Sequence, residues 1–242
     1  MNRRAITLAL LACGMFLGSL GCEAPGKPVL AETARPDDVL DFPTLYAQNC
    51  AACHGKDGKG GATLPLANPV YLAVAGTENI QRITTIGVAG TSMPPFAKSR
   101  GGMLSARQIA VLTSGIVETW GHSGAEQVTS YAATIPGDRA NGQAAYTTFC
   151  ARCHGASGTG TKGDSVVWTG SIVDPAYLAL VSDQYLRSTI IAGLPDRNMP
   201  DWRSDLVGPS ARPMTDQEIT DTVAWIVSHR VAAPGQPYSQ HQ

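Results

Sequence analysis

The chain has 242 residues, enough for one large domain or for two domains of about 100 residues each. Apolar residues make up 43% and charged residues 15%, which is typical of a globular protein and excludes a disordered or fibrous one. The formal charge of −1 gives no sign of a nucleic-acid-binding surface. Because 26 Gly and 16 Pro accompany only 6% aromatic residues, a bound apolar cofactor would supply missing core volume.

The N-terminus has the features of an export signal. Met1 to Arg4 carry two positive charges, and the apolar run from Ala5 to Leu17 is too short for a membrane span. The run leads into Gly18-Ser19-Leu20-Gly21-Cys22, which resembles a bacterial lipobox. We therefore predict a signal peptide over residues 1–21 and a lipid on Cys22. A plain secretory signal and an uncleaved anchor are the alternatives.

An internal repeat then determines the predicted domain organisation. The segment Leu45–Gly55, LYAQNCAACHG, recurs 100 residues later as AYTTFCARCHG, and Asn68-Pro69-Val70-Tyr71-Leu72 recurs 106 residues later as Asp174-Pro175-Ala176-Tyr177-Leu178. Two copies of one domain explain this repeated order. The predicted segments are a flexible tether at 22–37, a first domain at 38–122, a linker at 123–135, a second domain at 136–231 and a tail at 232–242.

Each copy is expected to be mostly helical. Ser105 with Gln108 and Thr215 with Glu218 have the spacing of capping boxes, and apolar residues follow both at helical intervals. Asp41 and Asn141 are predicted to cap the shorter helices that lead into Cys50 and Cys150. The expected fold class is all-α.

Two Cys-x-x-Cys-His motifs carry the chemistry. This motif is typical of covalent c-type haem attachment, in which two thiols add to the haem vinyl groups and the histidine binds iron. A four-cysteine zinc site would need the pairs much closer in sequence, and a thioredoxin-like motif would need a βαβ context. Disulfides would leave the two histidines unexplained. The sequence thus predicts two covalently bound haem c groups, one held by Cys50, Cys53 and His54, the other by Cys150, Cys153 and His154.

Each iron then needs a sixth ligand or an open site. Met93 and Met199 follow their haem histidines at similar distances, and each precedes a proline that favours an extended backbone. We predict these two thioethers as the axial ligands. Met103 and Met214 are the local competitors, but each lies just before a capping box, where it can act as a hydrophobic staple. His122 and His229 are interpreted as solvated residues near helix ends.

On these motifs, each half resembles a class I cytochrome c domain, and the two together resemble bacterial dihaem cytochromes c. The resemblance implies a helical fold wrapped around the haem, with terminal helices that cross through an aromatic contact. In the second half Tyr146, Trp225 and Gly142 match that crossing. In the first half Phe42 replaces the glycine and Gly115 replaces the tryptophan, so its crossing is expected to use Trp120. The resemblance also implies that the Pro65 carbonyl contacts His54.

Filled axial positions leave no coordination site for substrate, so the predicted function is single-electron transfer at fairly high potential and not catalysis. The expected partners are redox proteins, among them an integral membrane respiratory or photosynthetic complex. The expected location is the periplasmic side of a bacterial membrane, lipid-anchored or soluble. The alternative is a dihaem peroxidase or dehydrogenase with one catalytic haem. Arg82 and Arg187 are hypothetical partners of haem propionates.

Overall fold

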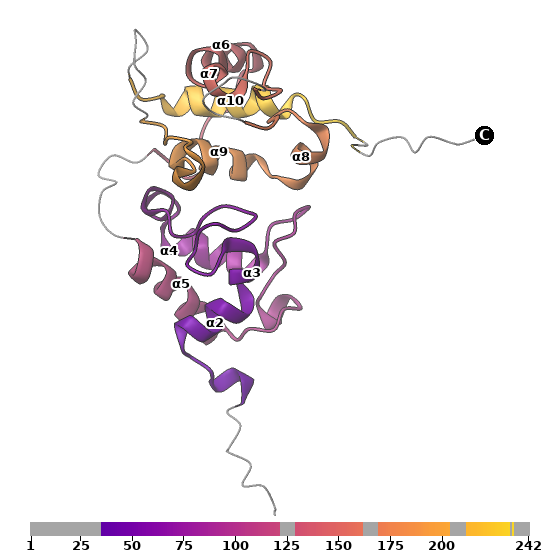
Figure 1. Ribbon diagram of the computed structural model, residues 1–242. Coiled ribbons are helices and arrows are strands. Elements are labelled where there is room, and N and C mark those ends of the chain that lie inside the picture. Colours follow the sequence, from indigo (N-terminus) through magenta and orange to yellow (C-terminus); the bar gives the residue numbers. More distant parts are fainter. Residues whose placement is uncertain (1–34, 122–128, 162–168, 204–211, 233, 235–242) are drawn as a thin grey trace, which may run out of the picture. The chain divides into compact units, whose positions relative to one another are not determined.

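The computed structural model describes residues 35–121, 129–161, 169–203, 212–232 and 234 (Figure 1). Within these ranges the regular elements are helices, and β-type pairing is limited to isolated bridges. The all-α prediction is confirmed. The predicted signal peptide, Cys22, His122, most of the tether and most of the tail lie outside the described residues. None of the described helices is long and apolar enough to cross a bilayer.

The two repeats have matching element orders. The first contains the 3-10 helix η1 (Pro36–Asp38), α2 (Phe42–Asn49), α3 (Ala51–His54), α4 (Pro69–Ile86), the 3-10 helix η2 (Lys98–Arg100) and α5 (Ala106–Trp120). The second contains α6 (Arg139–Phe149), α7 (Ala151–His154), α8 (Pro175–Leu180), α9 (Asp183–Ala192), the 3-10 helix η3 (Pro195–Arg197) and α10 (Asp216–Val227).

Helix α4 corresponds to α8 and α9 together. It is interrupted at Gly76, whose φ of 66° and ψ of 160° are not helical. The residue 106 positions later is Ser182, which caps the start of α9 by accepting the Tyr185 N–H. Both repeats therefore change helix direction at the same place, one through a glycine kink and the other through a break with a new cap.

Side-chain caps fix where the longer helices begin. Both capping boxes form, at Ser105 with Gln108 and at Thr215 with Glu218. Asp41 caps α2 as predicted, accepting the Thr44 N–H at 2.9 Å. The prediction for α6 was wrong, because its cap is Asp138 and not Asn141. The helix begins three residues earlier than expected, and Asn141 supplies the N–H that the Asp138 carboxylate accepts at 2.8 Å.

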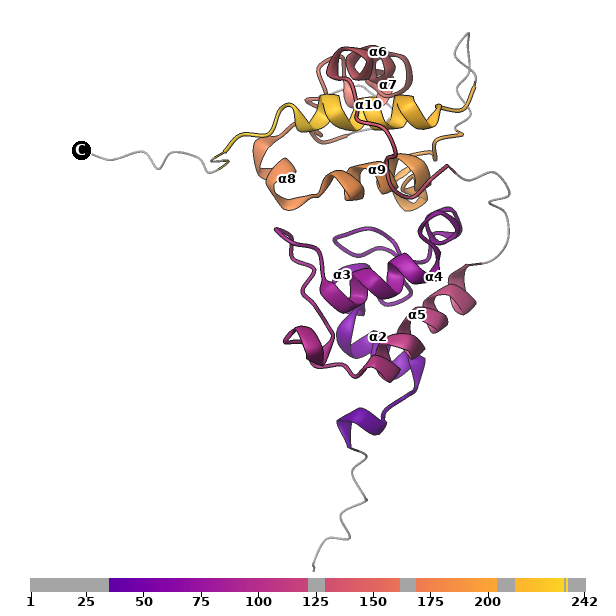
Figure 2. The same cartoon turned by 180° about the vertical axis from the view of Figure 1, so that it is seen from behind.

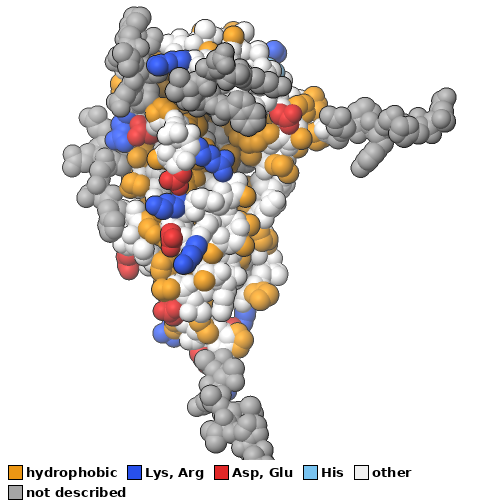
Figure 3. Space-filling model, viewed as in Figure 1, with side chains coloured by type: hydrophobic (Ala, Val, Ile, Leu, Met, Phe, Trp, Pro, Cys, Tyr) orange, Lys and Arg blue, Asp and Glu red, His pale blue; other side chains and the backbone are white. Residues whose placement is uncertain are grey.

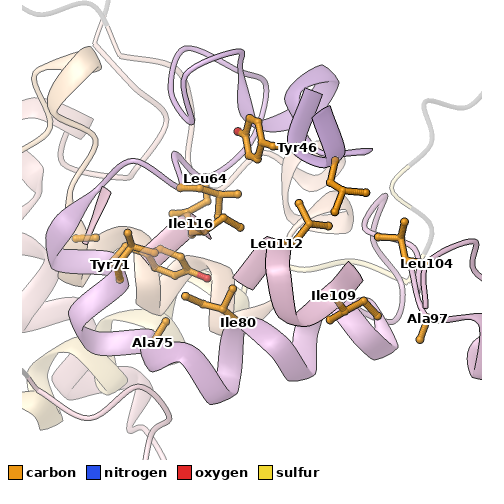
Figure 4. Packing of buried hydrophobic residues seen from close by; sticks show 14 residues of the cluster. Tyr46, Leu64, Tyr71, Ala75, Ile80, Ala97, Leu104, Ile109, Leu112 and Ile116 are labelled. Atoms are coloured by element: carbon orange, nitrogen blue, oxygen red, sulfur yellow. The ribbon is translucent and has the colours of Figure 1, made fainter. Parts of the chain in front are cut away.

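The core of the first half lies between α2, α4 and α5. Side chains from these helices and from the loop before α4 point toward a common interior (Figure 4). Leu112 and Ile116 of α5 and Leu45 of α2 are almost completely buried there. The apolar residues that follow the first capping box at helical intervals therefore pack into this core.

The crossing of the terminal helices differs between the halves. In the second half α10 lies across α6 (Figures 1 and 2), and a Cβ on Gly142 would come within 1.9 Å of the Asp221 carbonyl oxygen. Trp225 stacks on Tyr146 with ring centroids 4.1 Å apart. In the first half the Phe42 ring occupies the space above Gly115. There Trp120 meets Tyr46 edge-on at 5.0 Å, so the prediction that this crossing uses Trp120 is confirmed.

The two halves also contact each other. The Asn68 side chain, which caps α4 through its oxygen, donates its amide N–H to the Ala192 carbonyl at 2.9 Å. Val70 and Val74 pack against a buried cluster that contains Ile191 of α9. One asparagine thus joins the start of α4 to the end of α9.

Candidate functional site

The two Cys-x-x-Cys-His motifs form equivalent single helical turns. In α3 the N–H groups of Cys53 and His54 donate to the Cys50 carbonyl at 3.2 and 3.0 Å. The corresponding distances to the Cys150 carbonyl in α7 are 3.1 and 3.0 Å. Within the described ranges the four thiols form no disulfide. Each turn therefore presents two cysteine side chains outside any disulfide and one imidazole, which are the groups that covalent haem attachment requires.

The environment of the first thiol in each pair keeps it protonated. Burial, with a smaller effect from the Cys53 thiol, raises the pKa of Cys50 to about 11. Burial and the Cys153 thiol raise the pKa of Cys150 to about 12. A redox-active cysteine needs a lowered pKa, so this environment does not suit a thioredoxin-like thiol.

A tyrosine holds each motif against the preceding helix. The Tyr46 hydroxyl donates to the Gly55 carbonyl at 2.8 Å, and the Tyr146 hydroxyl donates to the Gly155 carbonyl. These carbonyls belong to the residues directly after His54 and His154. The aromatic crossings are thereby connected to the end of each motif by a hydrogen bond.

The histidines are in the neutral form that binds metals. Burial lowers the pKa of His54, although a hydrogen bond to the Leu64 carbonyl partly offsets the effect. Burial also lowers the pKa of His154. A neutral imidazole has one nitrogen lone pair free for iron.

The acceptor for His54 differs from the predicted one. His54 Nδ1 lies 2.8 Å from the carbonyl oxygen of Leu64, and the predicted acceptor, the Pro65 carbonyl, was wrong. The carbonyl carbon of Leu64 is bonded to the nitrogen of Pro65, so the proline is adjacent to the acceptor without providing it. A carbonyl only accepts, so His54 Nδ1 carries the proton and leaves Nε2 for a metal.

Met93 and Met199 lie in equivalent turns. The Val88 N–H donates to the Met93 carbonyl and the Leu194 N–H to the Met199 carbonyl, both at 2.9 Å. A glycine precedes each turn, Gly87 with φ 69° and Gly193 with φ 67°. Both methionine side chains are half-buried. These glycines were not predicted, although they stand at the same offset of 106 as the methionines.

The two glycines are required by the tightness of the turns. A Cβ on Gly87 would lie 2.7 Å from the Met93 carbonyl oxygen, and a Cβ on Gly193 would lie 2.7 Å from the Met199 carbonyl oxygen. A positive φ is also strained for any residue with a Cβ. The backbone therefore holds both methionine loops in one shape.

The competing methionines do not form an equivalent pair. Met103 is 80% exposed, whereas Met214 is buried in a cluster with Ile219. The staple interpretation therefore holds for Met214 and was wrong for Met103. His229 lies two residues after the end of α10 and is half-buried, not solvated as predicted, because its Nδ1 is 3.0 Å from the Trp225 carbonyl oxygen.

Arg187 has a role that the sequence did not reveal. It is buried, and its guanidinium donates to the Tyr131 and Ser130 carbonyls, to the Thr220 hydroxyl and to the Asp216 carboxylate. These contacts join α9 to α10 and to the segment before α6. Arg82 is exposed and donates to Asn79. The guanidinium of Arg187 is therefore used within the protein, which leaves the hypothesis of a haem-propionate contact by Arg187 without support.

Comparison with known proteins identifies the two halves. Residues 37–112 match the family model of cytochrome c oxidase, cbb3-type, subunit III, and residues 139–230 match that of cytochrome c. The chain is 29% identical over 156 residues to the cbb3-type cytochrome c oxidase subunit CcoP of Azospirillum sp. (strain B510), covering 58% of this chain and 49% of the relative. The chain thus spans about half the length of that relative.

Other relatives align with this chain over different lengths. The cbb3-type cytochrome c oxidase subunit FixP of Azorhizobium caulinodans is 28% identical over 198 residues, which is 80% of this chain and 60% of the relative. The cytochrome c subunit of a quinone alcohol dehydrogenase of Gluconacetobacter polyoxogenes is 35% identical over 96 residues, which is 35% of this chain and 20% of the relative. Among solved structures, a reducing HAO-like protein complex of Kuenenia stuttgartiensis aligns with a TM-score of 0.42 at 16% identity, covering 78% of this chain and 96% of that chain.

The matched ranges contain both motif helices, one in each range. The elements that carry each motif have the same order in the two ranges. The chain therefore consists of two tandem cytochrome c domains, each of which implies one covalent haem c, and belongs to the dihaem c-type cytochromes.

Proposed function

We propose that the chain transfers single electrons through two c-type haems, each held by two thioether bonds and by a histidine and a methionine. The observation that carries the proposal is the equivalence of the two sites. In both repeats a helical turn presents two cysteines and a histidine, and a glycine-initiated turn fixes the methionine. The proposed ligands are Cys50, Cys53, His54 and Met93 in the first domain, and Cys150, Cys153, His154 and Met199 in the second.

The proposed ligand set favours a carrier over a catalyst. A bound haem supplies a one-electron couple at its iron, and ligation by His and Met raises the reduction potential. If His54 and Met93 both bound one haem iron, no coordination position would remain for a substrate, and His154 with Met199 would have the same effect. A dihaem peroxidase or dehydrogenase would need one methionine to be absent or displaced.

The proposed partner is a membrane respiratory complex. Several relatives are named as subunits of cbb3-type oxidases, and others as the cytochrome c subunit of a quinone alcohol dehydrogenase. On the face shown in Figure 3, basic and acidic side chains alternate and neither sign forms a continuous patch. A subunit held beside its partner has less need of a strongly charged docking surface than a freely diffusing carrier does.

A lipid on Cys22 is the proposed attachment to the periplasmic side of the membrane. Cys22 follows the predicted signal peptide, and the tether of residues 22–37 separates it from the first domain. A Cys22→Ala variant with an otherwise unchanged signal should move from the membrane fraction to the soluble periplasmic fraction and lose the mass of the lipid. Membrane retention without added lipid mass would point to an uncleaved anchor instead.

The ligand assignment is tested by counting the haem irons that have a methionine ligand. We expect two haems per chain by mass spectrometry, and two equivalents of the Met–iron charge-transfer band at the red end of the oxidised spectrum. Met93→Leu and Met199→Leu should each remove one equivalent, because leucine has no thioether. Met103→Leu is the matched control, since that side chain is 80% exposed and should leave both equivalents unchanged.

The same experiment separates the alternatives. One band or none in the unsubstituted protein, together with cyanide binding at the other iron, would favour the peroxidase or dehydrogenase. Co-purification of the chain with oxidase subunits from native membranes would support the proposed partner. A chain that is recovered alone after mild solubilisation would instead be a free shuttle.

A further inference from the structure

The start of α4 in the first domain contacts the base of the Met199 turn in the second. The Asn68 amide N–H donates to the Ala192 carbonyl at 2.9 Å and, over a longer distance of 3.4 Å, to the Gly193 carbonyl. Gly193 is the glycine with positive φ at which the Met199 turn begins. A side chain of the first domain is therefore hydrogen-bonded to the backbone that carries the proposed ligand of the second iron.

This contact is buried between the two domains. Asn68 is 4% exposed and Ala192 is 2% exposed. Ala192 is the last residue of α9, yet it belongs to the buried core cluster of the first domain. Asn68, Val70 and Met199 also line one hollow, so the start of α4 lies along the methionine turn. Water cannot replace the amide of Asn68 at a buried carbonyl, so the loss of this donor has a cost.

The Met199 turn is closed tightly onto Gly193. The Leu194 N–H donates to the Met199 carbonyl at 2.9 Å, and the Met199 N–H donates to the Leu194 carbonyl at 3.1 Å. A Cβ on Gly193 would lie 2.6 Å from the carbonyl carbon of Pro200, the residue directly after the methionine. A displacement of the Met199 backbone must therefore also move the carbonyls that Asn68 binds.

The base of the equivalent turn in the first domain has a different environment. The offset of 106 residues relates Gly87 to Gly193 and Ile86 to Ala192. Ile86 is 43% exposed, whereas Ala192 is 2% exposed. The first domain thus covers the base of the turn in the second domain, while the base of its own turn is on the surface.

The residue that corresponds to Asn68 in the second repeat is Asp174. It caps α8, where its carboxylate accepts the Tyr177 N–H at 2.9 Å. A carboxylate has no N–H to donate, so Asp174 can share the capping role of Asn68 but not its role as a donor. The two positions therefore form a matched pair in which only one residue can hold a methionine turn of the other domain.

We propose that Asn68 is a positioning residue for the second haem, which holds the Met199 turn from the first domain and makes the thioether harder to displace from iron. This inference rests on the proposed function, since it requires Met199 to be an iron ligand. Displacement of the thioether moves the turn and breaks the hydrogen bonds from Asn68, so the free energy of these bonds opposes it. Contact between the domains thus protects the second iron from external ligands.

The test is a titration of the oxidised full chain, with both haems bound, with imidazole. Imidazole competes with the thioether for ferric iron, and loss of the Met–iron charge-transfer band measures the displacement. In a Met93→Leu background the remaining band belongs to Met199, and in a Met199→Leu background it belongs to Met93. Each methionine is thereby followed separately.

Asn68→Ser should affect the Met199 band alone. Serine keeps an N-cap oxygen for α4 and removes the amide N–H. The imidazole concentration at half-loss of the Met199 band should fall about two- to tenfold, as expected for the net loss of one hydrogen bond. The midpoint of the Met93 band should not change, although α4 itself leads into the Met93 turn. An unchanged Met199 midpoint, or equal shifts of both bands, would overturn the inference.

Asp174→Asn is the matched control. It alters the corresponding cap of α8, where asparagine is also a good cap, and it should move neither midpoint. A fall in the Met199 midpoint as large as that in Asn68→Ser would show that any altered helix cap loosens the methionine, and would contradict the specific role of Asn68.

A measurement that keeps Asn68 covers the case in which Asn68→Ser does not fold. The side-chain amide protons of Asn68 should exchange with solvent faster, by NMR, when imidazole occupies the second iron. Unchanged exchange would overturn the inference, because the contact would then survive displacement of the thioether. The proposed function fails separately, through the absence of two haems or of two Met–iron bands. Two bands with a Met199 midpoint that does not depend on Asn68 would refute this inference alone.

Discussion

Glu218 shows how a single residue makes one repeat sensitive to acid. It closes the capping box of α10, accepting the Thr215 N–H at 2.8 Å, and it also pairs with Arg212 at 2.6 Å. The hydrogen bond from Arg212, with smaller contributions from Thr215, lowers the pKa of Glu218 from 4.5 to about 2. In the first repeat the same position is Gln108, which forms the same capping box without a charge.

The first prediction concerns the pH dependence of stability. Because the pKa of Glu218 is lower in the folded state, its stabilising effect is complete above pH 4.5 and is lost as the pH falls toward 2. Glu218→Gln should keep the capping box, as Gln108 does, and reduce the loss of stability between these pH values. The measurement is the free energy of unfolding in urea at a series of pH values. Identical pH profiles for the variant and the unsubstituted protein would contradict the prediction.

Residues whose partners are close in sequence could be predicted, and those with distant partners could not. The capping boxes follow from a spacing of three residues, and Asp41 follows from its position before an apolar run. Arg187 could not be assigned because its acceptors lie up to 57 residues away. Leu64 was missed by one position, because the path of a loop decides which carbonyl faces His54. Asp138 was missed because α6 begins one turn before the expected residue.

At the scale of elements, the first and last helices of each repeat pack closely together, but the residues that allow the close packing differ between the repeats. In the second repeat the small residue is Gly142 on the first helix, and the large residue is Trp225 on the last. In the first repeat Phe42 is on the first helix and Gly115 on the last. Each crossing thus pairs one glycine with one aromatic ring, with the roles of the two helices exchanged.

The second prediction compares two Gly→Ala changes. In Gly142→Ala the new Cβ meets a backbone oxygen of α10 at 1.9 Å, so the helices must separate. In Gly115→Ala the new Cβ meets the Phe42 ring at 2.3 Å, and a side chain can rotate away. Overpacking of this kind costs about 1–3 kcal/mol. We expect Gly142→Ala to lie at the upper end of that range and Gly115→Ala at the lower end, measured by chemical denaturation.

A double-mutant cycle provides the control. Phe42→Ala removes the ring that obstructs the new methyl group at position 115, so the cost of Gly115→Ala should become smaller in that background. The Asp221 backbone oxygen has no such substitution, so Gly142→Ala should have the same cost whether or not Asp221 is changed to Asn. Additive effects of Phe42→Ala and Gly115→Ala would contradict the proposed packing.

At the scale of the whole molecule, Asn68 connects the two haem domains. Its oxygen accepts the Val70 and Tyr71 N–H groups at 3.0 and 3.1 Å, which caps α4. Its nitrogen donates to the Ala192 carbonyl at the end of α9. The residue is 4% exposed, so water does not replace either contact.

The third prediction separates these two roles of Asn68. Asn68→Asp keeps a good helix cap but replaces the donor by an acceptor opposite the Ala192 and Gly193 carbonyls. Leaving buried acceptors without a donor costs about 1–3 kcal/mol. We expect the two domains to unfold in two separate transitions in calorimetry of the holoprotein, whereas the unsubstituted protein should show stronger coupling. The same degree of coupling in both proteins would show that Asn68 does not join the domains.

The repeat in the sequence predicted two domains with the same element order, because it is a local pattern that appears twice. The contact between the domains had no such signal. Asn68 has the pattern of an ordinary helix cap, and nothing near it indicates that its amide nitrogen reaches residue 192. The kink at Gly76 was also not predicted. Its counterpart in the second repeat is Ser182, a helix N-cap, so the two positions share no residue pattern that would mark a change of helix direction.

The exchanged glycine and aromatic positions have a consequence for how the chain assembles. Tandem copies in one polypeptide risk pairing the first helix of one copy with the last helix of the other during folding. Here such an exchange would place Phe42 against Trp225, two bulky rings where only one fits. It would also leave Gly142 facing Gly115, with a void between them. Both mismatched helix pairs are therefore unfavourable, one through a steric clash and the other through a void. Shape complementarity alone thus favours the packing of each first helix against the last helix of its own domain.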